Sequence, residues 1–125
     1  MTVQEAIAEV NKLKQNTIDD GTKVMWLSRL DSLVYTEIIK AHRLNAATVI
    51  LPQVKETFTP YDENNAAEEV LIAPYTYADM YIFWLEAQIN YWNDDIENYN
   101  KAITRFTEKY NAFANWFNQN IRRDN

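Results

Sequence analysis

Apolar side chains recur at steps of three and four residues along the C-terminal third of the chain, and positions 77–120 contain neither Gly nor Pro. This spacing keeps one face of a helix apolar and is typical of a helix that packs along a seam. The pattern therefore predicts helix through most of 77–120. Its members are Ile82, Leu85, Ile89, Trp92, Ile96, Tyr99, Ile103, Phe106, Tyr110, Phe113 and Phe117.

The polar residues Asn93, Asp94 and Asp95 lie in the middle of this segment. Asn and Asp are weak helix formers, so they can mark a turn between the two helices of a hairpin. The apolar spacing continues across them without a slip, whereas a turn normally resets it. We therefore favour one continuous helix of about 65 Å, with part of its seam left for another subunit. The alternative is a helical hairpin within a compact four-helix bundle.

Two helices are predicted within residues 1–42. Thr2 and Glu5 have the spacing of a capping box, in which each side chain bonds to the backbone N–H of the other residue. Apolar positions from Val3 onward then predict a first helix of about three turns. Asp19 or Asp20 can cap a second helix that runs to about residue 42. Its apolar face contains Trp26, Leu27, Leu30, Val34, Ile38 and Ala41.

Residues 43–76 differ from the rest because they hold all three prolines of the chain. The stretches 48–51, 54–59 and 70–72 have the composition of extended segments, and 62–65 has that of a turn. Loops of this length are usually functional or disordered. The apolar side chains of Val49, Ile50, Leu51 and Phe58 argue against plain disorder. We therefore expect a partly extended arm or short hairpin that docks on another surface.

Together these patterns predict an all-α fold in a single domain over residues 1–125. The expected order is two N-terminal helices (1–42), a long, partly extended loop (43–76) and a long C-terminal helix or helical hairpin (77–120). A chain of 125 residues can bury a core without disulfides or metals. Four Trp, eight Tyr and five Phe supply bulky material for that core.

The chain is acidic, with 18 acidic against 12 basic residues and a net charge of −6. This charge opposes binding to phosphate backbones and to anionic membranes. The chain has no Cys, and its longest apolar run, at 46–51, is far shorter than the roughly 20 residues of a membrane span. The first residues lack the basic and apolar regions of a signal peptide. We expect a soluble, intracellular protein without specific nucleic-acid recognition.

Candidate chemistry is sparse. His42 is the only histidine, so a catalytic triad or a zinc site would lack its other members, and a cation at the end of a helix is the simpler interpretation. One Gly is too few for a phosphate-binding loop. Asp31 lies beside the apolar face of the second helix, where we favour a carboxylate at the solvent edge over a buried one. We expect neither an enzyme nor a bound metal or cofactor.

The rows of aromatic residues have two interpretations. Helically spaced Trp and Tyr most often form core, although they are also favoured anchors of interfaces between subunits. For the second interpretation the candidate interface residues come from the loop and from the C-terminal segment: Val49, Ile50, Leu51, Phe58, Tyr91, Phe106, Tyr110, Phe113 and Phe117.

Several stretches, taken in order, are similar to one group of proteins. They are 26–31 (Trp-Leu-Ser-Arg-Leu-Asp), 35–39, 58–62, 73–75, 81–91, 96–100 and 116–118. Over most of its length the chain resembles small proteins encoded in prophages of Gram-positive bacteria, among the capsid and head-to-tail joining genes. The chain departs from that family's pattern at Asp94, where Gly is common, and this departure favours an unbroken helix.

The resemblance implies a head completion or head–tail connector protein. Such proteins assemble as homo-oligomeric rings beneath the portal, contact portal or other neck proteins, and let DNA pass. The expected location is the virion, with the bacterial host cytoplasm during assembly. The family supplies no catalytic residues. The alternative is a small acidic helical protein that inhibits a partner, such as an immunity protein or an antitoxin.

Overall fold

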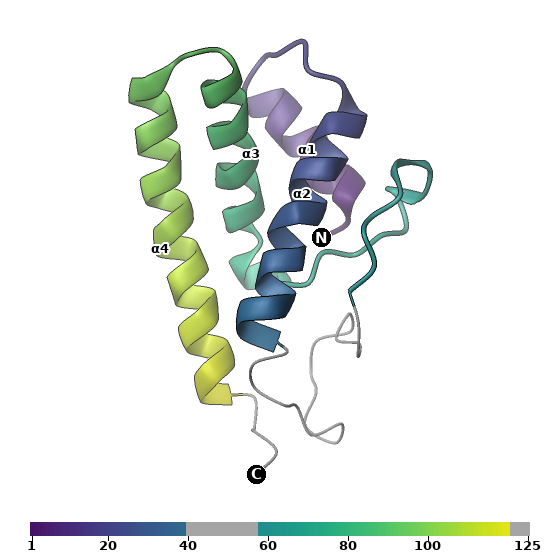
Figure 1. Cartoon of the computed structure of the whole chain (residues 1–125), viewed down its shortest axis with the longest axis vertical. Helices are drawn as coiled ribbons and strands as arrows, with labels where there is room; N and C mark the ends of the chain where they lie inside the picture. Colours follow the sequence, from purple (N-terminus) through teal and green to yellow (C-terminus); the bar gives the residue numbers. More distant parts are fainter. Residues whose placement is uncertain (40–57, 121–125) are drawn as a thin grey trace.

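Four α-helices pack in an up-down-up-down arrangement in the computed structural model, which describes residues 1–39 and 58–120 (Figure 1). They are α1 (Val3–Leu13), α2 (Asp20–Val34), α3 (Asp79–Trp92) and α4 (Ile96–Asn120). A π-helical turn, Tyr35–Ile39, extends α2, and short 3-10 turns lie at Glu63–Asn65 and Tyr75–Tyr77. The predicted all-α class is confirmed.

The first helix begins at the predicted capping box. The N–H of Glu5 donates to Oγ1 of Thr2 at 3.1 Å, and the N–H of Thr2 donates to Oε1 of Glu5 at 2.9 Å. These bonds satisfy donors that a helix start leaves without intrahelical partners. The second predicted cap is confirmed as well, because Asp19 accepts from the N–H of Thr22 at 2.7 Å.

Lys23 lies on the buried face of α2, which the sequence pattern did not indicate. The residue is 1% exposed. Its ammonium group donates to Oδ1 of Asn11 at 2.7 Å and to the carbonyl of Ile18 at 2.9 Å. Asp20 lies 3.7 Å away. A buried cation needs such partners, so these bonds fix the loop between α1 and α2 against the start of α2.

The segment 77–120 is a hairpin, and our preference for one continuous helix was wrong. α3 ends at Trp92, and α4 begins at Ile96 and runs beside it (Figure 1). Asp94 adopts a left-handed φ of 57°, and Asp95 caps α4 by accepting from the N–H of Asn98 at 3.3 Å. The step from residue 92 to residue 96 is four, which equals a helical step. The apolar spacing therefore continues through the turn by coincidence.

The segment 58–78 is held against the bundle by backbone hydrogen bonds to the first residues of the chain. Thr2 and Val70 form an isolated antiparallel bridge, and the N–H of Leu71 donates to the carbonyl of Met1 at 3.0 Å. The predicted turn at 62–65 is confirmed, with Asp62 accepting from the N–H of Asn64 at 3.0 Å. The predicted extended stretch at 48–51 lies outside the described residues, as does the predicted stretch at 54–59 except for residues 58 and 59, which form no strand.

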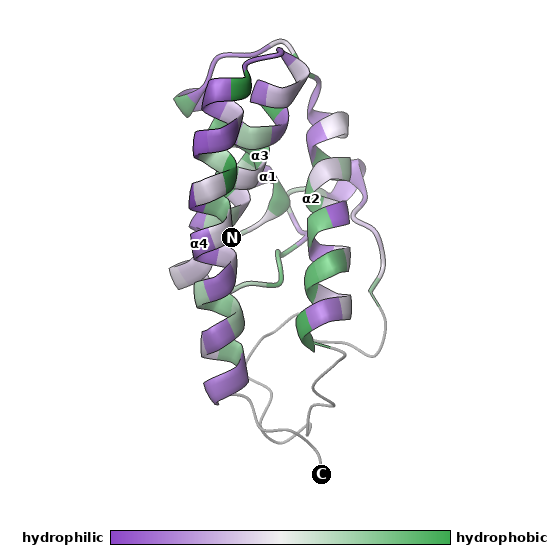
Figure 2. Ribbon diagram, turned by 60° about the vertical axis from the view of Figure 1, so that its left-hand side comes forward, coloured by the Kyte–Doolittle hydropathy of each residue, from purple (hydrophilic) through white to green (hydrophobic). Residues whose placement is uncertain are grey.

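The core lies where α1, α2, α3 and the end of α4 meet. Its largest fully buried side chains include Tyr81, Phe113, Phe117, Leu27 and Leu30. In Figure 2, α4 alternates between hydrophilic and hydrophobic bands, as expected of a helix with one buried face. Among the described helices, none combines the length and the apolar composition that crossing a membrane requires.

Candidate interaction surfaces

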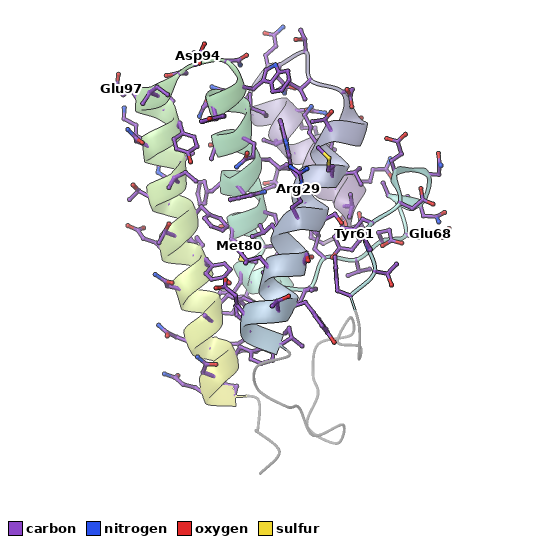
Figure 3. The ribbon with its side chains drawn as sticks, in the orientation of Figure 1. Arg29, Tyr61, Glu68, Met80, Asp94 and Glu97 are labelled. Atoms are coloured by element: carbon purple, nitrogen blue, oxygen red, sulfur yellow. The ribbon has the colours of Figure 1, made fainter. Side chains whose placement is uncertain are left out.

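Asp31 is the hydrogen-bonding centre of the core. Its carboxylate accepts from the hydroxyl of Tyr61, from the hydroxyl of Tyr81 at 2.7 Å and from the N–H of Ile72 at 2.9 Å. The Tyr81 hydroxyl in turn accepts from the N–H of Ala73 at 2.8 Å. Tyr61 lies beside α2, on the side of the bundle that residues 61–73 cover (Figure 3). The carboxylate thus joins α2, α3 and residues 61–73.

This carboxylate is fully buried, so the interpretation that placed it at the solvent edge was wrong. Burial raises the pKa of Asp31 to about 6, against the opposing effect of its three hydrogen bonds. Burial and the Asp31 charge raise the pKa of Tyr81 well above its ordinary value. The same two effects raise the pKa of Tyr61. The group therefore consists of one carboxylate and two phenols, and both phenols stay protonated at neutral pH. Its evident consequence is structural, since it positions residues 61–73 on the bundle.

The structure separates the predicted interface residues into three groups. Phe113 and Phe117 are 0% exposed and belong to the chain's own core, so they are not available to a partner in this fold. Phe58, Phe106 and Tyr110 are half-buried, and only Tyr91 is largely exposed among the predicted residues that the structure describes. Val49, Ile50 and Leu51 lie outside the described residues, as does His42.

The half-buried aromatics pack against neighbours of the same chain. Phe58 contacts the ring of Tyr61 edge to face, with centroids 5.4 Å apart. The Phe106 ring lies 5.0 Å from that of Trp84. The Tyr110 hydroxyl donates to Oε1 of Glu37 at 2.9 Å.

Four large apolar side chains are exposed at the end of the bundle that contains the α3–α4 turn. Leu13 is 63% exposed, Tyr91 63%, Trp92 68% and Ile96 55%. The Tyr91 ring lies 5.5 Å from that of Tyr99. We call Leu13, Tyr91, Trp92 and Ile96 the apolar end. The apolar spacing in the sequence had placed Trp92 and Ile96 in a buried helical seam. The polar residues between them were the signal that one residue ends a helix and the other begins the next.

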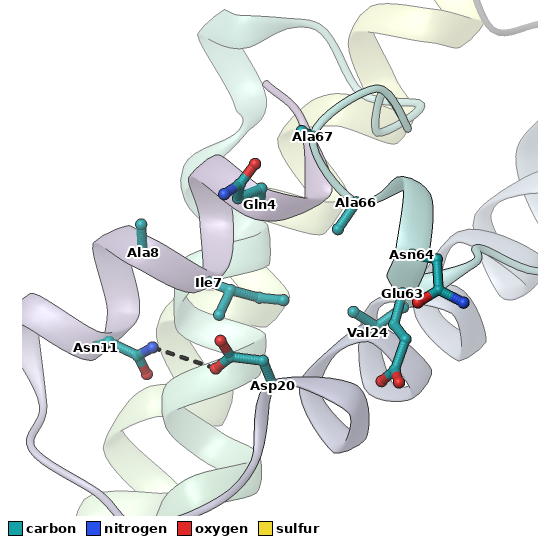
Figure 4. A pocket seen from close by; sticks show the side chains of 10 residues that line it. All are labelled: Gln4, Ile7, Ala8, Asn11, Asp20, Val24, Glu63, Asn64, Ala66 and Ala67. Carbon is teal, nitrogen blue, oxygen red and sulfur yellow. Dashed lines mark hydrogen bonds between the residues drawn. The ribbon is translucent and has the colours of Figure 1, made fainter.

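A groove of about 660 Å³ lies between α1, the start of α2 and the Glu63–Asn65 turn (Figure 4). Asp20 and Glu63 contribute carboxylates to its walls, and the Asn11 amide donates to Oδ1 of Asp20 at 3.4 Å. Gly21, the only glycine, lies beside it, and a Cβ there would overlap the Glu63 carboxylate. The groove can hydrogen-bond a basic or amide side chain of a partner.

Within residues 1–39 and 58–120, no group of three or more His, Cys, Asp or Glu side chains is arranged to hold a metal ion. Comparisons of the chain with models of known protein families, with curated proteins and with solved structures found no match.

Proposed function

We propose that this chain is a structural protein of a phage or prophage virion, a head–tail connector or head completion component. The resemblance described above supports this proposal, because it extends in order over most of the chain. The proposed place of action is the head-to-tail junction, reached after assembly in the bacterial cytoplasm. The proposed partners are the portal or another neck protein and further copies of the chain.

The apolar end is the observation that carries the proposal. Tyr and Trp are the residues that interfaces favour as anchors, because they combine a large apolar area with a polar group. Exposed clusters of such residues mark surfaces that bind another protein. Tyr91 and Trp92 are adjacent, and both are more than 60% exposed. We propose that the apolar end contacts the portal or a neighbouring neck protein.

The test uses phage that carry Tyr91→Ser together with Trp92→Ser. These phage should make DNA-filled heads that leak or fail to accept tails, whereas the isolated variant should melt like the parent because both side chains are exposed. Tyr75→Ser is the matched control, since Tyr75 is an 81% exposed aromatic outside the apolar end. Normal particles from the double variant would contradict the proposal.

The groove between α1, the start of α2 and the Glu63–Asn65 turn favours the inhibitor alternative, because the carboxylates of Asp20 and Glu63 in its walls can bind a basic partner. Pull-down from the encoding host separates the two functions. A connector should retain portal or neck proteins, whereas an inhibitor should retain one basic non-virion protein in a small heterodimer. The second result would replace the connector proposal.

A further inference from the structure

A second pocket, of about 330 Å³, opens between the end of α1, α3 and the first half of α4. Lys14, Lys101 and Arg105 line it together with a single carboxylate, that of Glu86. Lys101 also pairs with Glu97 at 3.5 Å, but both side chains are more than half exposed, and such pairs contribute little. Among the residues that line the pocket, three cations thus face one carboxylate, and Asp95, whose pKa is lowered by hydrogen bonds, lies close enough to Lys14 and Lys101 for both to lower that pKa further.

Asn90 belongs to the same lining and is 3% exposed. Among the described residues its Oδ1 atom has no hydrogen-bond donor, and a buried unsatisfied acceptor is a costly arrangement. Lys14 and Arg105 both lower the pKa of Glu86, against the larger effect of its burial. These two cations thus act on the same small volume. The pocket fits a segment that offers carboxylates to the cations and an N–H donor to Asn90.

The chain itself contains a segment with both groups. Residues 62–69, which we call the acidic turn, read Asp-Glu-Asn-Asn-Ala-Ala-Glu-Glu. Glu63, Asn64, Asn65 and Glu68 are exposed. Glu68 lies on the side of the molecule away from α4 (Figure 3). The acidic turn and the pocket share no residue, so one copy can use both at once.

We infer that the acidic turn of one copy docks in this pocket of a second copy. Its carboxylates face Lys14, Lys101 and Arg105, and an asparagine amide of the turn donates to Asn90. Such a contact is head-to-tail, so it closes into a ring or continues as a filament. It rests on the proposed function, for which it identifies the contact between neighbouring copies. The contact gains further strength from effective concentration once several copies share one platform.

The absence of Cys from the chain allows a direct test with single-cysteine variants. Leu13→Cys places a thiol at the pocket and Ala67→Cys places one on the acidic turn; Leu13 and Ala67 are both exposed. The two proteins are mixed with oxidised glutathione, and the dimers are identified by mass. Docking should make the mixed dimer exceed the dimers of each variant with itself by roughly tenfold, because docking raises the effective thiol concentration. Tyr75→Cys in place of Ala67→Cys should give only the statistical proportion.

Charge reversal provides the second half of the test. Lys101→Glu with Arg105→Glu, added to the Leu13→Cys protein, should abolish the excess, and Glu63→Lys with Glu68→Lys on the Ala67→Cys protein should restore it. All four positions are exposed, and circular dichroism verifies that each variant is folded. A statistical proportion of mixed dimer in the parent pair would overturn the inference, as would an excess that survives reversal of one side. If the chain is present in virions but the mixed dimer does not exceed the statistical proportion, the proposed function remains supported and only the proposed contact between copies is refuted.

Discussion

Replacing Asp31 is the most informative test of how the core is held together. Asp31→Ala removes the acceptor of three hydrogen bonds and leaves the Ile72 N–H and the Tyr81 O–H buried without an acceptor. The two fully buried groups cost about 1–3 kcal/mol each and the partly buried Tyr61 hydroxyl about 1 kcal/mol, so the total loss is roughly 3–7 kcal/mol. Removing a buried charge offsets about 3 kcal/mol of this, the equivalent of a pKa raised from 3.8 to about 6. We expect a net loss of up to about 4 kcal/mol at pH 7.

Asp31→Asn should behave differently. Its amide oxygen can still accept from Ile72 and Tyr61, while its N–H can donate to the Tyr81 hydroxyl. The Tyr81 O–H loses its acceptor, at a cost of about 1–3 kcal/mol, and the cost of the buried charge, about 3 kcal/mol, disappears. At pH 7 the Asn variant should therefore be at least as stable as the parent.

The difference in unfolding free energy between the parent and Asp31→Asn should depend on pH in a defined way. Because the folded-state pKa of Asp31 is raised, the folded protein binds this proton more tightly than the unfolded chain. The associated stability is fully present below pH 3.8 and is lost as the pH rises to about 6. In that window the parent should lose about 1.4 kcal/mol per pH unit relative to Asp31→Asn. Hydrogen bonds lower the pKa of other carboxylates, such as Glu5, Asp19 and Asp95. These groups are present in both proteins, so their contributions cancel in the difference in unfolding free energy.

Urea unfolding followed by circular dichroism at pH 4, 5, 6, 7 and 8 measures the difference in unfolding free energy between parent and Asp31→Asn. The difference should favour the Asn variant increasingly up to about pH 6 and stay level above it. A difference that is constant from pH 4 to pH 8 would refute the assignment of the buried, titrating carboxylate to Asp31.

Three further substitutions test other parts of the fold. Asp94→Gly should raise the unfolding free energy by about 0.5–1 kcal/mol, because Gly adopts the left-handed φ without strain; a lowered melting temperature would contradict the turn geometry. Phe113→Ala should cost about 3–5 kcal/mol and Phe106→Ala clearly less, because Phe113 is 0% exposed and Phe106 only half-buried; equal losses in urea unfolding would place both in one environment. Gly21→Ala should stabilise α2 by about 1 kcal/mol when Glu63→Ala is also present, and by less in the parent, where the Glu63 carboxylate must move; an additive double-mutant cycle would show that the two residues do not interact.

The parts of the fold that the sequence predicts correctly depend on neighbouring residues. The start of α1 follows from Thr2 and Glu5, and the start of α2 from Asp19, because a helix cap and its partner are separated by three residues. The turn at Glu63–Asn65 is local in the same way. Capping and turn signals therefore identify these boundaries without knowledge of the tertiary structure.

The errors arise where distant residues decide. The partners of Asp31 are 30, 41 and 50 positions away along the chain, so nothing near Asp31 in the sequence indicates that it is satisfied in the core. Lys23 is similar, because its acceptors come from α1 and the following loop. The hairpin was the alternative and not the preferred interpretation, because the spacing of apolar residues describes one face of a helix and does not record a reversal of direction that preserves the spacing.

The measurement closest to the central claim is quantitative mass spectrometry of purified virions from the host that encodes the chain. The connector proposal predicts that the chain copurifies with intact particles at a fixed ratio to the portal, and that particles lacking it contain DNA but no tail. Absence of the chain from tailed, infectious particles would contradict the proposal, whatever its behaviour in solution.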